Sequence, residues 1–171
     1  MRRTALLVIC LSMLIALAGC GQSQISTESV PEDFSFSLTW GCYGISSYNS
    51  ATGELIKTTD ATNPSDYVTN YTLSVEEKSK IYDMISSLNL YSYPDSYNPN
   101  EGVFSDPSMT LVLTIHLNGT DKTVRAENIA TSFVSKSKKG RSFLTTCKNI
   151  SEMLTGTKEW KALPDYEHLY A

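Results

Sequence analysis

Several stretches of the chain alternate apolar and polar residues, as strands with one buried face do. In residues 34–40, FSFSLTW, an aromatic residue or leucine stands at every second position. A period of two predicts a half-buried strand. Further strands are predicted near 43–48, 54–59 and 67–72, and turn-forming Asn, Asp, Gly or Pro residues separate them. The first half of the chain therefore predicts a sheet.

Residues 109–126 predict a β-hairpin. Their apolar residues fall at every second position on both sides of an Asn-Gly dipeptide at 118–119, whose positive φ angles suit a two-residue turn. With that turn, His116 lies opposite Asp121 on the polar face.

Two other segments have helical spacing. Ser74 and Glu77 form a capping box, in which each side chain bonds a free backbone N–H of the first turn. Together with the apolar residues behind it, this predicts a helix over 75–88. A second long helix is predicted through residues 143–154, ending at Gly156.

Together the elements predict an α+β domain: an antiparallel sheet of about six strands with two main helices packed on one face. Trp160, Leu163 and Tyr166 follow the second helix and offer apolar surface to cover one end of the core.

The first residues have the layout of an export signal. A positively charged start precedes an apolar run at 5–18, which is short for a spanning helix of about 20 residues. Its end, Leu17-Ala18-Gly19-Cys20, resembles the lipobox of bacterial lipoproteins, in which the cysteine takes a diacylglycerol and becomes the first mature residue. The resemblance implies a signal peptide over 1–19 and a lipidated Cys20. A permanent transmembrane helix and ordinary secretion are the alternatives.

Residues 20–33 follow, comprising the lipidated cysteine that the resemblance implies and a polar segment at 21–33 without aromatic side chains, whose composition predicts a flexible tether. Its reach is about 20 Å. Residues 34–171 are then a single domain, lipid-anchored at the extracytoplasmic face of the cell membrane.

The net charge of the chain limits the classes of partner that it is expected to bind. The chain has 14 basic and 18 acidic residues, and the signal peptide removes two arginines, so the mature chain is net negative. This argues against nucleic acid. We expect the membrane as a partner through lipidated Cys20, together with an envelope protein, glycan or peptide. No zinc-ligand spacing or phosphate-binding loop is recognised, so no metal or cofactor is predicted.

Two cysteines, Cys42 and Cys147, remain in an oxidising compartment after Cys10 leaves with the signal and Cys20 takes lipid. A disulfide between them would close a long loop and stabilise the fold by about 4 to 5 kcal/mol. Two buried thiols are the alternative.

The order of these elements resembles an uncharacterised family of secreted and lipid-anchored bacterial domains with an early Cys-Tyr/Phe-Gly strand motif. The matching positions are Cys42-Tyr43-Gly44, Tyr48, Gly53-Glu54, residues 73–77, residues 95–97, Ser105-Asp106 and Trp160. Ser46 stands where the family has a second cysteine, so no local cysteine pair is expected. The resemblance implies the fold and location but no activity.

His116 and Asp121 are the first candidate for chemistry, because a carboxylate orients and charges an imidazole. They could act as an acid/base pair, although no nucleophile can be placed beside them. The alternative is an exposed cross-strand pair worth a few tenths of a kcal/mol.

The predicted loop over residues 91–106 is the second candidate. It is rich in tyrosines and oxygen ligands: Tyr91, Tyr93, Asp95, Tyr97, Asn98, Asn100, Glu101 and Asp106. Such oxygens suit calcium, and exposed tyrosines suit sugars or peptides. Alternatively, some tyrosines cover the core and the acidic groups are solvated.

A basic cluster of Lys136, Lys138, Lys139 and Arg141 lies where the second helix begins. Positive charge is unfavourable at a helix N-terminus. It suggests an anionic partner such as lipid headgroups or wall polymers, and a solvated face is the alternative.

These observations predict a membrane-anchored lipoprotein that acts as a non-catalytic binding or interaction module of the cell envelope. No catalytic motif is recognised, so an enzyme is not expected. The alternatives are an envelope hydrolase that uses His116 and Asp121, and a purely structural envelope lipoprotein.

Overall fold

The computed structural model describes residues 29–42, 45–58, 66–100, 106, 108–130 and 135–165. The predicted signal peptide, the predicted lipidation site Cys20, most of the predicted tether, and Tyr43-Gly44 of the strand motif lie outside these ranges. No helix within them is long and apolar enough to cross a membrane.

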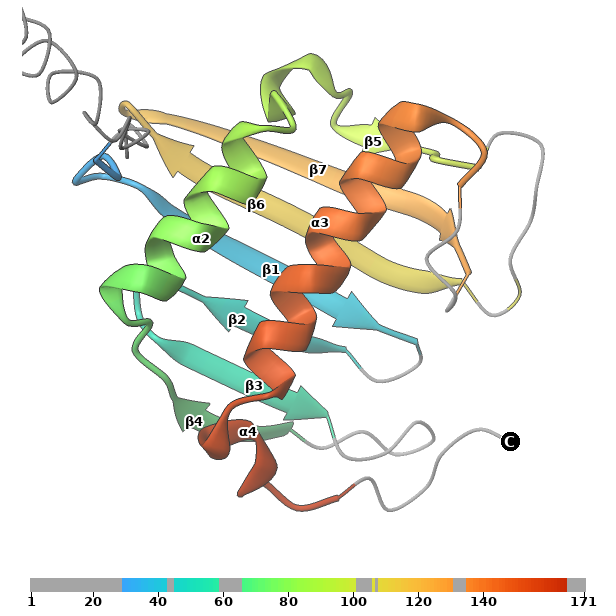
Figure 1. Ribbon diagram of the computed structural model, residues 1–171. Helices are drawn as coiled ribbons and strands as arrows, with labels where there is room; N and C mark the ends of the chain where they lie inside the picture. The colour runs from blue at the N-terminus through green and yellow to red at the C-terminus, as the bar shows by residue number, and fades with distance from the viewer. Residues whose placement is uncertain are drawn as a thin grey trace, which may run out of the picture.

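A single sheet runs through the described part of the chain, with strands in the order β4-β3-β2-β1-β6-β7-β5 (Figure 1). The strands are β1 (Ser35–Gly41), β2 (Ser46–Asn49), β3 (Glu54–Thr58), β4 (Asp66–Asn70), β5 (Ser96–Tyr97), β6 (Met109–Leu117) and β7 (Thr120–Ile129). Six of them pair antiparallel, as predicted, but β5 pairs parallel with β7. The sheet is therefore mixed and has seven strands, and the seventh lies within the predicted loop.

Two long helices, α2 (Val75–Ser86) and α3 (Lys138–Thr155), lie across the same face of the sheet (Figure 1). The capping box is confirmed, because the Ser74 side chain accepts from the Glu77 N–H and the Glu77 side chain accepts from the Ser74 N–H. A short 3-10 helix, η1 (Leu90–Ser92), follows α2, and α4 (Lys158–Lys161) follows α3. The α+β prediction with two main helices on one face is thus confirmed.

The core lies between these helices and the sheet. Alternate residues of β1 and β6 point into it, so Leu38 and Leu113 lie opposite each other and are fully buried. Phe143 and Ile150 of α3 are also fully buried. Each such side chain contributes about 1.5 to 3 kcal/mol of transfer free energy. The alternation in the sequence therefore encodes one covered face.

One end of the core is closed by Trp160 of α4, as predicted. Its ring lies 5.8 Å from that of Trp40, centroid to centroid, and the Lys57 ammonium lies 5.5 Å from the Trp160 ring centroid. Leu163 is half-buried, whereas Tyr166 lies outside the described residues.

The folded part begins before Phe34. Val30 packs against the core, and the Asp33 carboxylate accepts a hydrogen bond of 2.8 Å from the Gly119 N–H in the turn between β6 and β7. The end of the predicted tether is therefore attached to the domain, since its side chains make contacts that a polar composition does not indicate.

Candidate functional site

The face of the sheet opposite α2 and α3, which we call the open face, carries no helix of the described chain (Figure 1). Strand pairing places its side chains in rows across the strands. One row holds Arg125, Val112, Thr39, Ser47, Ile56 and Val68, and the next holds Thr123, Thr114, Ser37, Asn49, Glu54 and Asn70. The side chains are mostly short, and neither row has an aromatic residue. The open face is thus broad, and ten of the twelve residues in these two rows are uncharged.

His116 lies at one end of the open face. Its predicted pairing with Asp121 is confirmed, and Nδ1 lies 2.6 Å from Asp121 Oδ1. On its other side, His116 lies opposite Ser35 of β1, and Nε2 lies 3.9 Å from Asp33 Oδ2. The imidazole is 41% exposed, so solvent and solutes reach it. The sequence did not indicate that Ser35 lies near His116, because no local pattern predicts that β1 pairs with β6.

The tyrosines of the predicted binding loop have mainly structural roles. Tyr93 is buried, its hydroxyl donates to the Lys139 carbonyl, and burial raises its pKa to about 12. Tyr97 packs against Tyr93 and Phe143, whereas Tyr91 is exposed. Tyr93 and Tyr97 therefore cover the core, and only Tyr91 of the three is left exposed.

Several oxygen ligands of the same loop make contacts within the domain in its described part. Asp95 pairs with Lys122, and Asn98 Oδ1 accepts from the Asn100 N–H at 2.9 Å. Asp106 is exposed, and Glu101 lies outside the described residues. No group of three histidine, cysteine or acidic side chains suited to a metal occurs in the described ranges.

Two members of the basic cluster make contacts within the domain. Lys139 Nζ donates to the Ser92 carbonyl at 2.8 Å and lies 4.3 Å from the Tyr93 ring centroid. Arg141 donates to the Lys136 carbonyl. These two contacts hold the start of α3 in place. They offset the unfavourable effect of positive charge at a helix N-terminus without an external anion.

Cys42 and Cys147 are free thiols, so the candidate disulfide is absent from this structure. Cys147 is fully buried in α3, and burial raises its pKa. Cys42 is half-buried, and its pKa is raised by burial and by Asp106. Neither thiol is therefore activated as a nucleophile.

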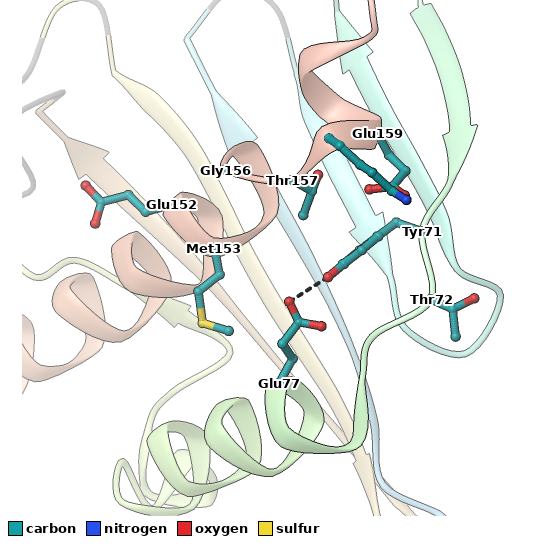
Figure 2. A pocket seen from close by; sticks show the side chains of 9 residues that line it. Tyr71, Thr72, Glu77, Glu152, Met153, Gly156, Thr157 and Glu159 are labelled. Carbon is teal, nitrogen blue, oxygen red and sulfur yellow. Dashed lines mark hydrogen bonds and ion pairs between the residues drawn. The ribbon is translucent and has the colours of Figure 1, made fainter.

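A groove of about 550 Å³ lies on the covered side, between the segment after β4, the first turn of α2 and the junction of α3 with α4. Figure 2 shows Tyr71 pointing toward Glu77 across it. The Tyr71 hydroxyl donates to Glu77 Oε1 at 2.6 Å, and Oε2 accepts from the Ser74 N–H at 2.8 Å. Both carboxylate oxygens are therefore engaged.

The contact between Tyr71 and Glu77 shifts the pKa of both side chains. The Tyr71 hydrogen bond lowers the pKa of Glu77 against the opposing effect of burial, while burial and the Glu77 carboxylate raise the pKa of Tyr71. Tyr48 extends the contact, because its hydroxyl donates to the Tyr71 carbonyl and burial raises its pKa to about 12. The Tyr71–Glu77 pair is a poor general base at neutral pH and ties the end of the sheet to α2.

The other carboxylates of the groove also have partners. Glu152 pairs with Lys148 one turn earlier, and Glu159 lies 3.8 Å from Lys158. The groove therefore presents paired charges, and we assign it a structural role.

Comparison of the sequence with models of known protein families and with curated proteins finds no match. The resemblance to secreted and lipid-anchored bacterial domains therefore stays a prediction, and function has to be argued from the structure.

Proposed function

We propose that this chain is an extracytoplasmic lipoprotein, anchored by Cys20, whose open face binds a protein partner in the cell envelope. The observation that carries the proposal is the one-sided packing of the sheet: α2 and α3 cover one face and leave the other face of the seven strands without a helix of the described chain.

The side chains of the open face suit a protein surface. Thr39, Ser47 and Val112 in its centre are short, so ordering them on binding costs little conformational entropy. Val68 at the edge is 57% exposed and offers apolar area. Sugars are usually held by aromatic side chains, which neither row provides. A flat protein surface is therefore the occupant we favour over a glycan.

The anchor fits this arrangement. Cys20 precedes Ser29, the first described residue, by nine positions, and the tether predicted from composition would reach about 17 Å over that length. The domain would stay close to the membrane, and the search for a membrane-bound partner would be confined to a thin layer.

The anchor is tested by Cys20→Ala in the full chain. We expect this variant to leave the membrane fraction and appear as soluble protein, whereas the control Cys42→Ala stays in the membrane. A Cys20→Ala variant that still sediments with membranes contradicts lipid attachment at this residue.

A further inference from the structure

We propose that this chain forms a dimer with a second copy of itself through β4, the edge strand of the sheet. Strand β4 ends the strand order, so β3 is its one neighbouring strand in the described part of the chain (Figure 1). A free strand edge is a template for another strand, because it presents a row of unpaired N–H and C=O groups. The dimer goes beyond the partner binding proposed for the open face and does not rest on it.

The hydrogen bonds around β4 show which of its residues point to the free edge. The Tyr71 N–H, directly after the strand, donates to the Gly53 carbonyl at 2.7 Å, on the side of β3. Backbone groups alternate in direction along a strand, so every second residue from Tyr71 also points toward β3. The residues between them, whose backbone points outward, are Asp66, Val68 and Asn70. They are also the exposed residues of β4.

Strand β4 matches a second copy of itself in an antiparallel register centred on Val68. In that register the outward-pointing residues oppose one another as hydrogen-bonded pairs, and each pair shares two N–H···O bonds. Val68 faces its own copy, and Asp66 faces Asn70 of the second copy. The carboxylate therefore lies beside an amide, whereas a register centred on Asp66 would oppose two carboxylates. On the covered side Tyr67 faces Thr69 of the second copy, a favourable aromatic and β-branched pair.

Val68 adds an apolar contact at the two-fold axis. Its side chain is 57% exposed in the single chain, and the second copy would remove part of this area from water. Lysine and proline, which often block edge pairing in natural sheets, are absent from β4. The sequence of this strand thus permits pairing along its whole length.

The opposite edge of the sheet differs, because the segment from η1 to β5 lies along β7. The Arg125 N–H donates to the Asp95 carbonyl at 2.8 Å, and the Tyr91 hydroxyl donates to the Thr120 carbonyl at 3.4 Å. Pairing of β4 with β4 uses the same edge of both copies, so it gives a closed dimer and not a growing chain. Its two-fold axis is perpendicular to the sheet, and the open faces of both copies therefore join into one surface.

The expected affinity is moderate. A pair of five-residue strands buries less area than the roughly 1,200 Å² of a stable interface, so we expect a dissociation constant in the micromolar range. Attachment of both copies to one membrane through Cys20 would raise their effective concentration.

The test measures the mass of the purified full chain in density-matched detergent by sedimentation equilibrium. Protein at up to about 100 µM detects micromolar dissociation constants. We expect the unchanged protein to approach the mass of two chains. Val68→Lys places two charges together at the two-fold axis and should weaken the dimer at least about tenfold. Val75→Lys is the matched control, because Val75 is an 81% exposed valine on α2, and it should dimerise as the unchanged protein does.

Val68→Pro is a second variant of the edge. It removes an N–H that points away from β3, so the domain should keep its fold while the dimer is lost. Circular dichroism melting shows that each variant is folded.

The register has its own test. Asn70→Asp would oppose two carboxylates across the interface and should weaken the dimer. Addition of Asp66→Lys to Asn70→Asp gives opposite charges in the same pair and should restore it. The proposal is overturned if the unchanged protein sediments as a single chain at every concentration, if Val68→Lys leaves the dimer unchanged, if Val75→Lys weakens it equally, or if Asp66→Lys does not restore the Asn70→Asp dimer.

Discussion

The two faces of the sheet are built from alternate residues of the same strands. On β1 and β6, Leu38 and Leu113 point under the helices and are fully buried, whereas Thr39 and Thr114 point to the open face and are half-exposed. The side chains of the covered face are buried in the core and serve packing. The open face contributes little to packing, so its side chains can be selected for contacts with other molecules.

The largest expected effect is a difference in unfolding free energy between a substitution on the covered face and one on the open face. Leu113→Ala should lower the free energy of unfolding by about 2 to 5 kcal/mol, since it leaves a cavity in the core. Its neighbour Thr114 shares a hydrogen bond with the Thr123 hydroxyl across the open face and is not in the core, so Thr114→Ala should cost under about 1 kcal/mol. Urea unfolding of both variants measures the difference. Equal losses would mean that the open face is packed against something.

A smaller effect is expected for the hydrogen bond between Tyr71 and Glu77, which joins the end of the sheet to α2. Tyr71→Phe removes the hydroxyl bound to Glu77 and should cost about 1 to 2 kcal/mol near neutral pH, because the bond is charge-assisted but partly exposed to solvent. Tyr91→Phe is the control, as Tyr91 is exposed.

The same pair predicts a pH dependence. The pKa of Glu77 is lowered in the folded state, so its stabilisation is present above the unfolded value of about 4.3 and is lost as pH falls through the folded value. The unchanged protein should lose more stability than Tyr71→Phe between about pH 5 and pH 3. Parallel curves in thermal unfolding would contradict this assignment.

The smallest expected change in stability is on the open face. Thr39→Arg adds a long charged side chain at its centre and should alter the unfolding free energy by about 0.5 kcal/mol or less. It should nevertheless displace a bound protein, which can be followed by native electrophoresis of detergent-solubilised membranes. A variant that keeps its complex would place the partner elsewhere.

The sequence predicted the elements whose signals are local. Alternation predicted β1, β6 and β7, turn residues bounded the other three predicted strands, the Asn-Gly turn predicted the pairing of His116 with Asp121, and Ser74 with Glu77 predicted the start of α2. Each signal depends on residues close together in the chain, where spacing determines geometry.

The missed features depend on distant contacts. Strand β5 has two residues, too few for a periodic pattern. Ser35 lies opposite His116 only because β1 pairs with β6, which is far along the chain. Tyr93 and Tyr97 were candidate ligand residues because composition does not reveal which tyrosines α3 will cover. Tertiary packing, not local pattern, decided these outcomes.

The most direct test of the open face is photo-crosslinking in intact cells. A benzophenone amino acid would replace Thr39 in the centre of the open face or Lys80 on the exposed side of α2. We predict an adduct of one defined size from position 39, its loss when Val112→Arg is added, and no such adduct from position 80. An adduct from position 80 that position 39 does not give would contradict binding by the open face.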